Sequence, residues 1–178
     1  MKSRSVHFSS ESNEWSTPEE LFQLLDQYFC FNLDPCCTHK TAKCKRHFTV
    51  KEDGLKQEWD GRVFVNPPYS GGIGKWVQKA YQSSLGGALV VLLLPVRTDT
   101  SWWHDYCCKG KVEFFRGRVR FNNGIRNNAA PFPSCLVAFG LPYDCTWLAQ
   151  FMREWNERKI KKNDLSEVLS RLYTGKNP

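Results

Sequence analysis

The chain lacks any apolar stretch long enough to cross a membrane. Its longest apolar run, residues 88–96, is about half of the ~20 residues that a spanning helix needs, and no apolar signal core follows Met1. We therefore expect no membrane segment and a bacterial cytoplasmic location. In that compartment the eight cysteines are expected to be reduced thiols, because a disulfide framework belongs to secreted chains.

Internal repeats, low-complexity tracts and an interdomain linker are also absent. With 41% hydrophobic residues, a chain of 178 residues can bury about 70% of the surface that its unfolded form exposes, which predicts one core. Residues 1–13 are polar and without periodicity, so we expect a flexible N-terminal arm and a single domain over residues 14–178. The net charge of +7 favours a polyanionic partner, because Lys and Arg gain affinity by releasing counterions from phosphates.

Hydrophobic periodicity predicts an α/β fold with a parallel sheet. Thr17, as an N-cap before Pro18, predicts a helix that begins at residue 18. Helices are expected over residues 18–28, after the glycines at 71–74, over 99–108, around 147–155 and from Asp164; strands are expected over 29–34, 62–66, 87–95, 111–121 with a break at Gly117, and 134–140. Open α/β sheets bind ligands beyond the carboxyl ends of their strands, so Asp34 and Asn66 should line one crevice.

The tetrapeptide Asn66-Pro67-Pro68-Tyr69 directly follows one of these strands. The exocyclic amine of adenine is a poor nucleophile, and an enzyme that methylates it must hold the amino hydrogens with acceptors. The Asn66 side chain and the Pro67 carbonyl can supply these acceptors, and the two prolines stiffen the loop that aims them. Tyr69 would stack on an adenine flipped out of a duplex. The alternative is that two prolines simply end the strand.

The order and spacing of seven segments over residues 15–140 resemble those of the small phage-type DNA N6-adenine methyltransferases, a Dam-like family. The segments are Glu14-Trp15-Ser16-Thr17-Pro18, Leu33-Asp34-Pro35-Cys36, Asp53-Gly54-Leu55, Trp59-Asp60-Gly61, Asn66-Pro67-Pro68-Tyr69-Ser70, Arg97-Thr98-Asp99-Thr100 and Gly117-Arg118-Val119-Arg120-Phe121. The resemblance implies a Rossmann-like methyltransferase fold with a compact single sheet and flanking helices. It also implies S-adenosylmethionine as the methyl donor, adenine-containing DNA as the substrate, residues 66–69 as the catalytic loop, and a phage or prophage gene that protects DNA from restriction.

Two acidic residues are candidates for binding the methyl donor. Asp34 stands at a strand end, where a carboxylate commonly holds a ribose diol, and Asp53 can accept a hydrogen bond from an adenine amino group. The resemblance adds their neighbours and an N-terminal contact segment: Pro35, Gly54, Leu55, Trp15, Thr17 and Pro18. The alternative role for Asp34 is a cap for the following turn, and the alternative for Trp15 is packing in the core. No glycine-rich G-x-G loop follows the first strand, so the methionine end of the donor has no assigned residues.

Basic residues in the middle of the chain predict a surface that faces DNA. The candidates are Arg97, Thr98, Asp99, Arg118, Arg120 and Arg126, with asparagines at positions 122, 123, 127 and 128. Arginine pairs with phosphate or guanine, and asparagine can pair with adenine edges. The alternative is a solvated basic surface, which is our interpretation of the run Lys159-Ile160-Lys161-Lys162.

Other functional classes compete with DNA methylation. Cys36, His39, Cys44 and His47 have a spacing that suits zinc, which would make the chain a non-enzymatic nucleic-acid-binding module, although we predict no metal. The glycines of residues 71–74 do not form a phosphate loop, because Trp76 stands where Ser or Thr is required. An RNA adenine or a protein glutamine presents a similar planar nitrogen and is the alternative substrate.

Overall fold

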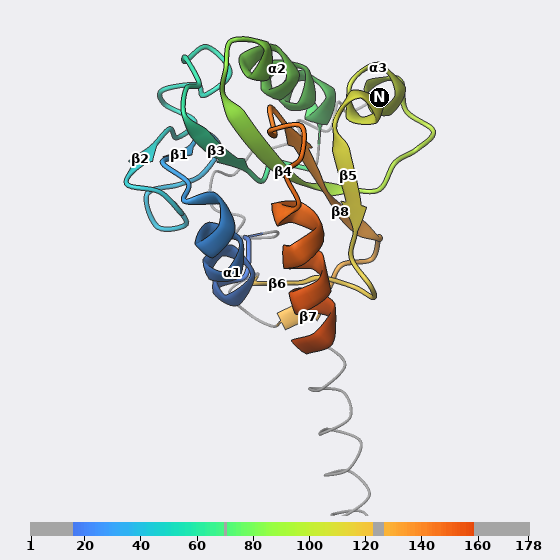
Figure 1. Ribbon diagram of the computed structural model, residues 1–178. Coiled ribbons are helices and arrows are strands. Elements are labelled where there is room, and N and C mark those ends of the chain that lie inside the picture. Colours follow the sequence, from blue (N-terminus) through green and yellow to red (C-terminus); the bar gives the residue numbers. More distant parts are fainter. Residues whose placement is uncertain (1–15, 70, 123–126, 159–178) are drawn as a thin grey trace, which may run out of the picture.

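A six-stranded sheet lies at the centre of the structure, a computed structural model that describes residues 16–69, 71–122 and 127–158 (Figure 1). The strand order is β2-β1-β3-β4-β8-β5. The strands are β1 (Leu33–Asp34), β2 (Arg46–His47), β3 (Arg62–Val65), β4 (Leu89–Pro95), β5 (Lys111–Phe114) and β8 (Ser134–Phe139). Strands β1 to β4 pair in parallel, whereas β8 runs antiparallel to both β4 and β5.

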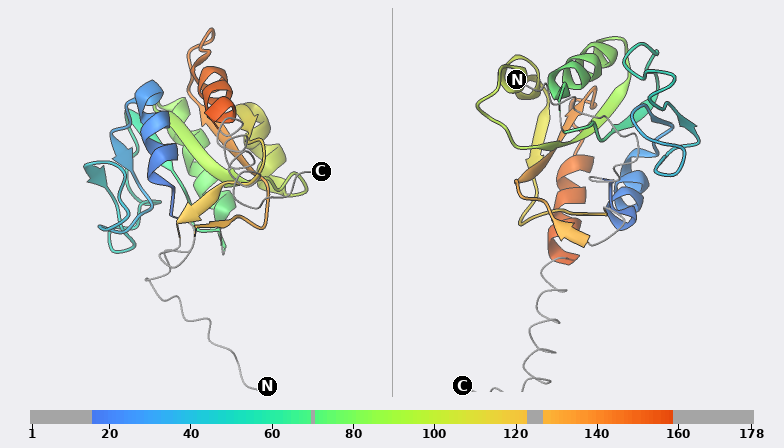
Figure 2. Two further views of the ribbon diagram at one scale, coloured as in Figure 1. Left: turned by 90° about the horizontal axis from the view of Figure 1, so that it is seen from below. Right: turned by 180° about the vertical axis from the view of Figure 1, so that it is seen from behind.

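Helices cover both faces of this sheet. On one face lie α1 (Glu19–Phe29) and the helix over residues 147–158; on the other lie α2 (Ile73–Leu85) and α3 (Ser101–Asp105), which a 3₁₀ turn (Cys107–Lys109) follows (Figures 1 and 2). The strand register explains which helices lie on which face, because neighbouring residues of a strand point to opposite faces. Phe64 aligns with Val91 of β4 and contacts Phe22 of α1. Phe139 aligns with the neighbouring Val90 and contacts Tyr81 of α2 on the other face.

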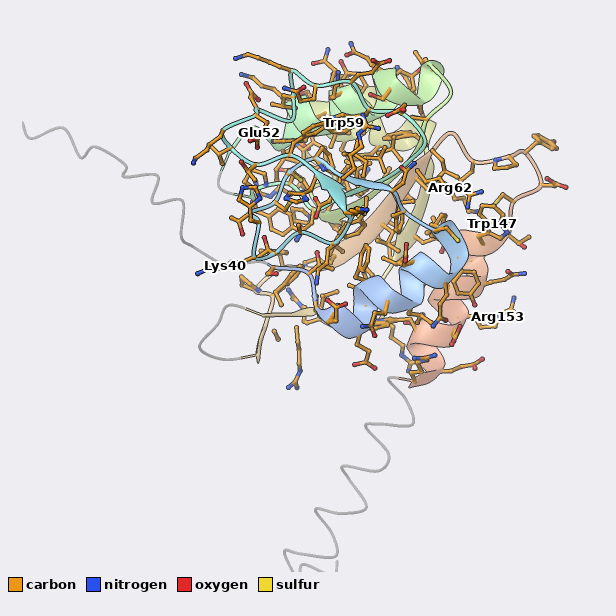
Figure 3. All side chains as sticks on the ribbon, turned by 90° about the vertical axis from the view of Figure 1, so that its left-hand side faces the viewer. Lys40, Glu52, Trp59, Arg62, Trp147 and Arg153 are labelled. Atoms are coloured by element: carbon orange, nitrogen blue, oxygen red, sulfur yellow. The ribbon has the colours of Figure 1, made fainter. Side chains whose placement is uncertain are left out.

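The two helices on the α1 face are joined by contacts between distant parts of the sequence. The Tyr28 hydroxyl donates a hydrogen bond of 2.8 Å to Glu154, and the Phe29 ring meets Trp147 edge-on. Arg62, at the start of β3, places its guanidinium 5.8 Å from the centre of the Trp147 ring (Figure 3). The helix over residues 147–158 is thereby held on the sheet by the strand that leads to Asn66.

The predicted α/β class is confirmed, and the apolar run over residues 88–96 contains the fully buried strand β4. No helix among the described residues is both long enough and apolar enough to span a membrane. The eight cysteines all lie in the described part of the chain, where each is a free thiol.

Three local predictions were wrong. Thr17 is not the N-cap of α1: Pro18 is, and none of the described side chains makes a capping hydrogen bond there. The strand expected over residues 29–34 is confined to Leu33–Asp34, because α1 continues to Phe29 and Cys30 turns the chain with a φ of 48°. The sheet is not purely parallel. Strand β8 starts beside the end of β4, where the Val96 N–H donates to the Pro133 carbonyl, so β8 runs in the direction opposite to β4.

The segment between β5 and β8 adds β6 (Arg120–Asn122) and β7 (Asn127–Ala129), which pair as a separate antiparallel sheet. Sequence analysis predicted strand structure on both sides of Gly117, which β5 and β6 confirm, but it missed β2 and β7. Several predictions lie outside the described residues: the arm over residues 1–13, Trp15, Arg126, the basic run at 159–162 and the helix expected from Asp164.

Candidate active site

The strand order places the topological switch point of the sheet between the carboxyl ends of β1 and β3. From β1 the chain moves outward to β2, and from β3 it moves the opposite way to β4, so the topology reverses between these two strands. Asp34 ends β1 and Asn66 directly follows β3, and both therefore reach the same edge. The two loops also touch, because the backbone N–H of Asn66 lies within hydrogen-bonding reach of the Cys36 thiol.

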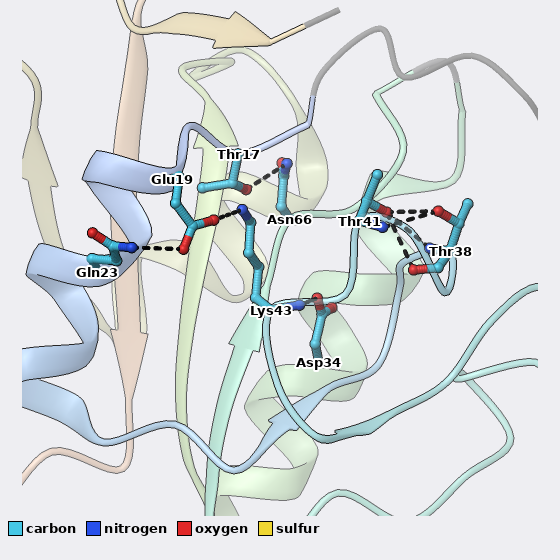
Figure 4. A network of polar contacts seen from close by, with 8 residues as sticks. All are labelled: Thr17, Glu19, Gln23, Asp34, Thr38, Thr41, Lys43 and Asn66. Atoms are coloured by element: carbon cyan, nitrogen blue, oxygen red, sulfur yellow. Dashed lines mark hydrogen bonds and ion pairs between the residues drawn. The ribbon is translucent and has the colours of Figure 1, made fainter. Parts of the chain in front are cut away.

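Asn66 is held by a residue from the start of the chain. Its Nδ2 donates a hydrogen bond of 2.9 Å to Oγ1 of Thr17, whose side chain is buried with 4% of the residue exposed (Figure 4). Next to it Pro67 is buried and Pro68 is exposed. The structure thus brings the predicted catalytic loop and part of the predicted N-terminal donor segment together, although 49 positions separate Thr17 from Asn66.

Tyr69 anchors the other end of this loop. Its hydroxyl donates a 3.0 Å hydrogen bond to the Leu93 carbonyl of β4, and its ring meets Phe121 and Phe132 edge-on, with 6% of the residue exposed. Burial raises the pKa of Tyr69 well above its usual value. The ring packs against protein in this conformation, so stacking on a base stays a prediction and requires the ring to leave this position.

Asp34 organises the loop that follows β1. One carboxylate oxygen accepts the Cys36 N–H at 3.4 Å and the other accepts the Lys43 N–H at 3.0 Å, while only 3% of the residue is exposed. Burial raises the pKa of Asp34, and these N–H groups lower it in part. The alternative that Asp34 caps the following turn is confirmed by these contacts, and its binding to a ribose stays a prediction.

Lys43 connects this loop to α1 and was missed by sequence analysis. Its ammonium lies 2.6 Å from the Glu19 carboxylate and 5.8 Å from the centre of the Phe22 ring. Because the Lys43 backbone also binds Asp34, one residue holds both the loop and the helix (Figure 4). No motif contains Lys43, and only its place in the fold indicates this role.

The two predicted donor-binding segments are in direct contact. A Cβ added to Gly54 would lie 1.9 Å from the Pro35 carbonyl oxygen, so only glycine fits there. The Gly54 carbonyl accepts a 2.8 Å hydrogen bond from the Trp59 indole, which stacks on Trp76 at a centroid distance of 5.9 Å. Beside it, Asp53 has a φ of 53° and its carboxylate pairs with the Lys56 ammonium at 3.0 Å; Leu55 is half-buried.

The described candidates for DNA contact lie on the surface. Arg97, Thr98 and Asp99 form an exposed turn directly after β4, at the edge of the sheet that carries Asn66. Arg118 and Arg120 are also exposed, and the Arg118 guanidinium donates to the Ala130 carbonyl at 3.4 Å. Phe121 contacts Tyr69, so the segment with both arginines packs against the predicted catalytic loop.

The zinc alternative finds no support in the described part of the chain. No group of three or more His, Cys, Asp or Glu side chains there is arranged to hold a metal ion. His39 and His47 instead contact each other, with 2.9 Å between Nδ1 and Nε2.

Comparison with known proteins identifies a family that matches this chain. The sequence model of the family described as DNA N-6-adenine-methyltransferase (Dam) matches residues 4–139. The chain belongs to this family. That match covers all of the central sheet and ends at the last residue of β8, which leaves the helix over residues 147–158 outside it.

Two curated relatives extend the comparison. A DNA N-6-adenine-methyltransferase of Haemophilus phage HP1 (strain HP1c1) is 32% identical over 148 residues, which cover 78% of this chain and 85% of that protein. A protein named putative methyltransferase YfdM of Escherichia coli (strain K12) is 28% identical over 78 residues, which cover 39% of this chain and 86% of that protein.

Proposed function

We propose that this Dam-family chain transfers a methyl group from S-adenosylmethionine to N6 of adenine in DNA, with Asn66 and Pro67 as the groups that polarise the amine. Family membership supports adenine-N6 methylation of DNA. The assignment of the loop is supported by one observation above all: Asn66 stands at the topological switch point, with its amide held in one orientation by Thr17.

The proposed chemistry needs two acceptors at fixed positions. The Asn66 side-chain oxygen accepts one hydrogen of the adenine amine and the Pro67 carbonyl accepts the other. Both contacts draw the nitrogen lone pair out of conjugation with the ring. The nitrogen would then bond to the methyl carbon as the carbon–sulfur bond of the donor's sulfonium breaks and leaves a thioether, and one N6 proton would pass to solvent. No covalent bond to the enzyme forms. An adenine in a duplex must leave its base stack to reach this loop.

The residues around the crevice fit S-adenosylmethionine. The buried carboxylate of Asp34 and the half-buried Asp53 are acceptors for ribose hydroxyls and an adenine amine, and Pro35 and Leu55 offer apolar surface beside them. The bound cofactor would supply an electrophilic methyl group. Residues 34–37 follow β1, where related folds have a glycine-rich loop, so the backbone of this loop would hold the remaining part of the donor.

DNA would approach over the exposed side of the catalytic loop. Arg97, Arg118 and Arg120 are exposed around it and are suited to phosphate contacts, which agrees with the net charge of +7. We further propose that methylation protects phage DNA from restriction; a phage origin is supported by the relative from phage HP1.

The test is transfer of labelled methyl from S-adenosylmethionine to unmethylated DNA, with RNA and bulk protein as parallel acceptors and nucleoside mass spectrometry of the product. We expect N6-methyladenine in DNA, and an Asn66→Ala variant that loses most turnover but binds S-adenosylmethionine with unchanged affinity by calorimetry. Label only in RNA or protein would overturn the substrate. Full activity of Asn66→Ala would overturn the assignment of the loop.

A further inference from the structure

Thr17 has a buried hydroxyl that the fold itself does not require. Sequence analysis predicted it as a helix cap, but α1 begins after Pro18, and no described side chain caps it. A buried hydroxyl costs stability unless it is hydrogen-bonded. Its hydrogen bond with Asn66 Nδ2, at 2.9 Å, supplies that partner, so the role of this hydroxyl lies in the catalytic loop and not in the helix.

The hydrogen bond holds the Asn66 amide in one rotation, with Nδ2 facing the Thr17 hydroxyl. A carboxamide has an acceptor oxygen and a donor nitrogen, and rotation of the group exchanges them. The target amine offers hydrogens, so a donor nitrogen facing it would repel it. Because Nδ2 faces Thr17, the oxygen lies at the opposite end of the amide and is turned away from the hydroxyl.

Thr17 is itself held rigidly. Pro18, with a φ of −57°, restricts the backbone directly after it, and Glu19 pairs with Lys43, whose backbone binds Asp34 (Figure 4). The hydroxyl therefore has a fixed position relative to both loops of the crevice.

We propose that Thr17 is a positioning residue that orients Asn66 for methyl transfer. This inference rests on the proposed function and differs from the role that sequence resemblance implies for Thr17, which is contact with the methyl donor. A donor contact would alter the affinity for S-adenosylmethionine, whereas a positioning contact would alter turnover by the saturated enzyme.

Two substitutions separate these roles. Thr17→Val keeps the shape of the buried side chain and removes the hydroxyl, and Thr17→Ser keeps the hydroxyl and removes a methyl group. The measurements are kcat and the KM for DNA at saturating S-adenosylmethionine, the calorimetric Kd for S-adenosylmethionine, and the melting temperature. Thr17→Ala replaces Thr17→Val if the valine variant does not fold.

We expect kcat of Thr17→Val to fall about tenfold, the size of one hydrogen bond, with both binding constants unchanged. Thr17→Ser should restore most of the turnover. In an Asn66→Ala background, Thr17→Val should cause no further loss, because the group that it positions is gone.

Wild-type kcat in Thr17→Val would overturn the proposal, and so would a raised Kd for S-adenosylmethionine with normal kcat at saturation. Neither result affects the assignment of Asn66, since a loss of turnover in Asn66→Ala is measured in the same series. If Asn66→Ala is fully active, the proposed function of the loop fails, and the positioning role fails with it.

Discussion

The contact between Gly54 and Pro35 leads to a sharp prediction about donor binding. Alanine at position 54 would place its Cβ 1.9 Å from the Pro35 carbonyl oxygen, which is backbone and cannot rotate away. One of the two loops must then move by about 1.5 Å to restore van der Waals contact. Because Pro35 follows Asp34, this movement displaces the carboxylate that we expect to bind the donor.

Gly54→Ala should change both the stability of the fold and the affinity for S-adenosylmethionine. Forced overpacking costs roughly 1–3 kcal/mol, which for a chain of this size lowers the melting temperature by about 2–12 °C. Displacement of a binding group by more than 1 Å should raise the Kd for S-adenosylmethionine by about 10- to 100-fold. Differential scanning fluorimetry and isothermal titration calorimetry measure the two effects.

Gly71→Ala is the matched control. A Cβ at Gly71 meets nothing within 4 Å, and neither Gly71 nor Gly54 has a positive φ. The control should therefore leave the Kd unchanged and alter the free energy of unfolding by less than about 1 kcal/mol. If Gly54→Ala melts and binds S-adenosylmethionine as Gly71→Ala does, the reasoning that this contact shapes the donor site is refuted.

Three further predictions test other parts of the site. Tyr69→Phe removes the hydrogen bond to the Leu93 carbonyl and should lower the melting temperature by about 2–4 °C for a loss near 1 kcal/mol; an unchanged melting temperature would show that the ring does not occupy this position in solution. The pKa of Asp34 is raised by burial, so the stability that its protonated form contributes is lost as pH rises from the ordinary value of 3.8 through the folded-state pKa. In urea titrations the stability of the wild type relative to Asp34→Asn should thus fall with rising pH, and a rise would contradict the burial argument. Arg97→Ala and Arg120→Ala should each reduce the slope of log DNA affinity against log salt concentration by the amount that about one phosphate contact contributes. A slope equal to that of the wild type would show that the substituted arginine does not contact DNA phosphate.

Several features of this protein could be predicted from local sequence. Strand β4 is recognisable because every residue in it is apolar, and helix α1 because its apolar residues recur on one side. The polar residues that end β1 and follow β3 indicated the edge of the sheet that they share in the structure, since strand ends can be identified within a few residues. The segments shared with the Dam family added the order of these parts.

Other features depend on contacts between residues far apart in the chain, which leave no periodic signal. The direction of β8 follows from where the segment before it leaves the sheet, and β2 is too short to show a pattern. The same is true of Lys43, which acts through its neighbours in space. Burial of the Tyr69 ring was equally hidden, because its partners Leu93 and Phe121 come from two later strands.

Thr17 shows most clearly the difference between what local sequence predicts and what the tertiary structure decides. The sequence alone identified it as a polar residue before a helix and as part of a family segment, and both observations were correct. Local rules then favoured a capping role, because a hydroxyl before a helix usually caps it. Only the tertiary structure brings Asn66 to the hydroxyl, across 49 positions, and a side chain with one hydrogen-bonding group binds the partner that the fold places beside it.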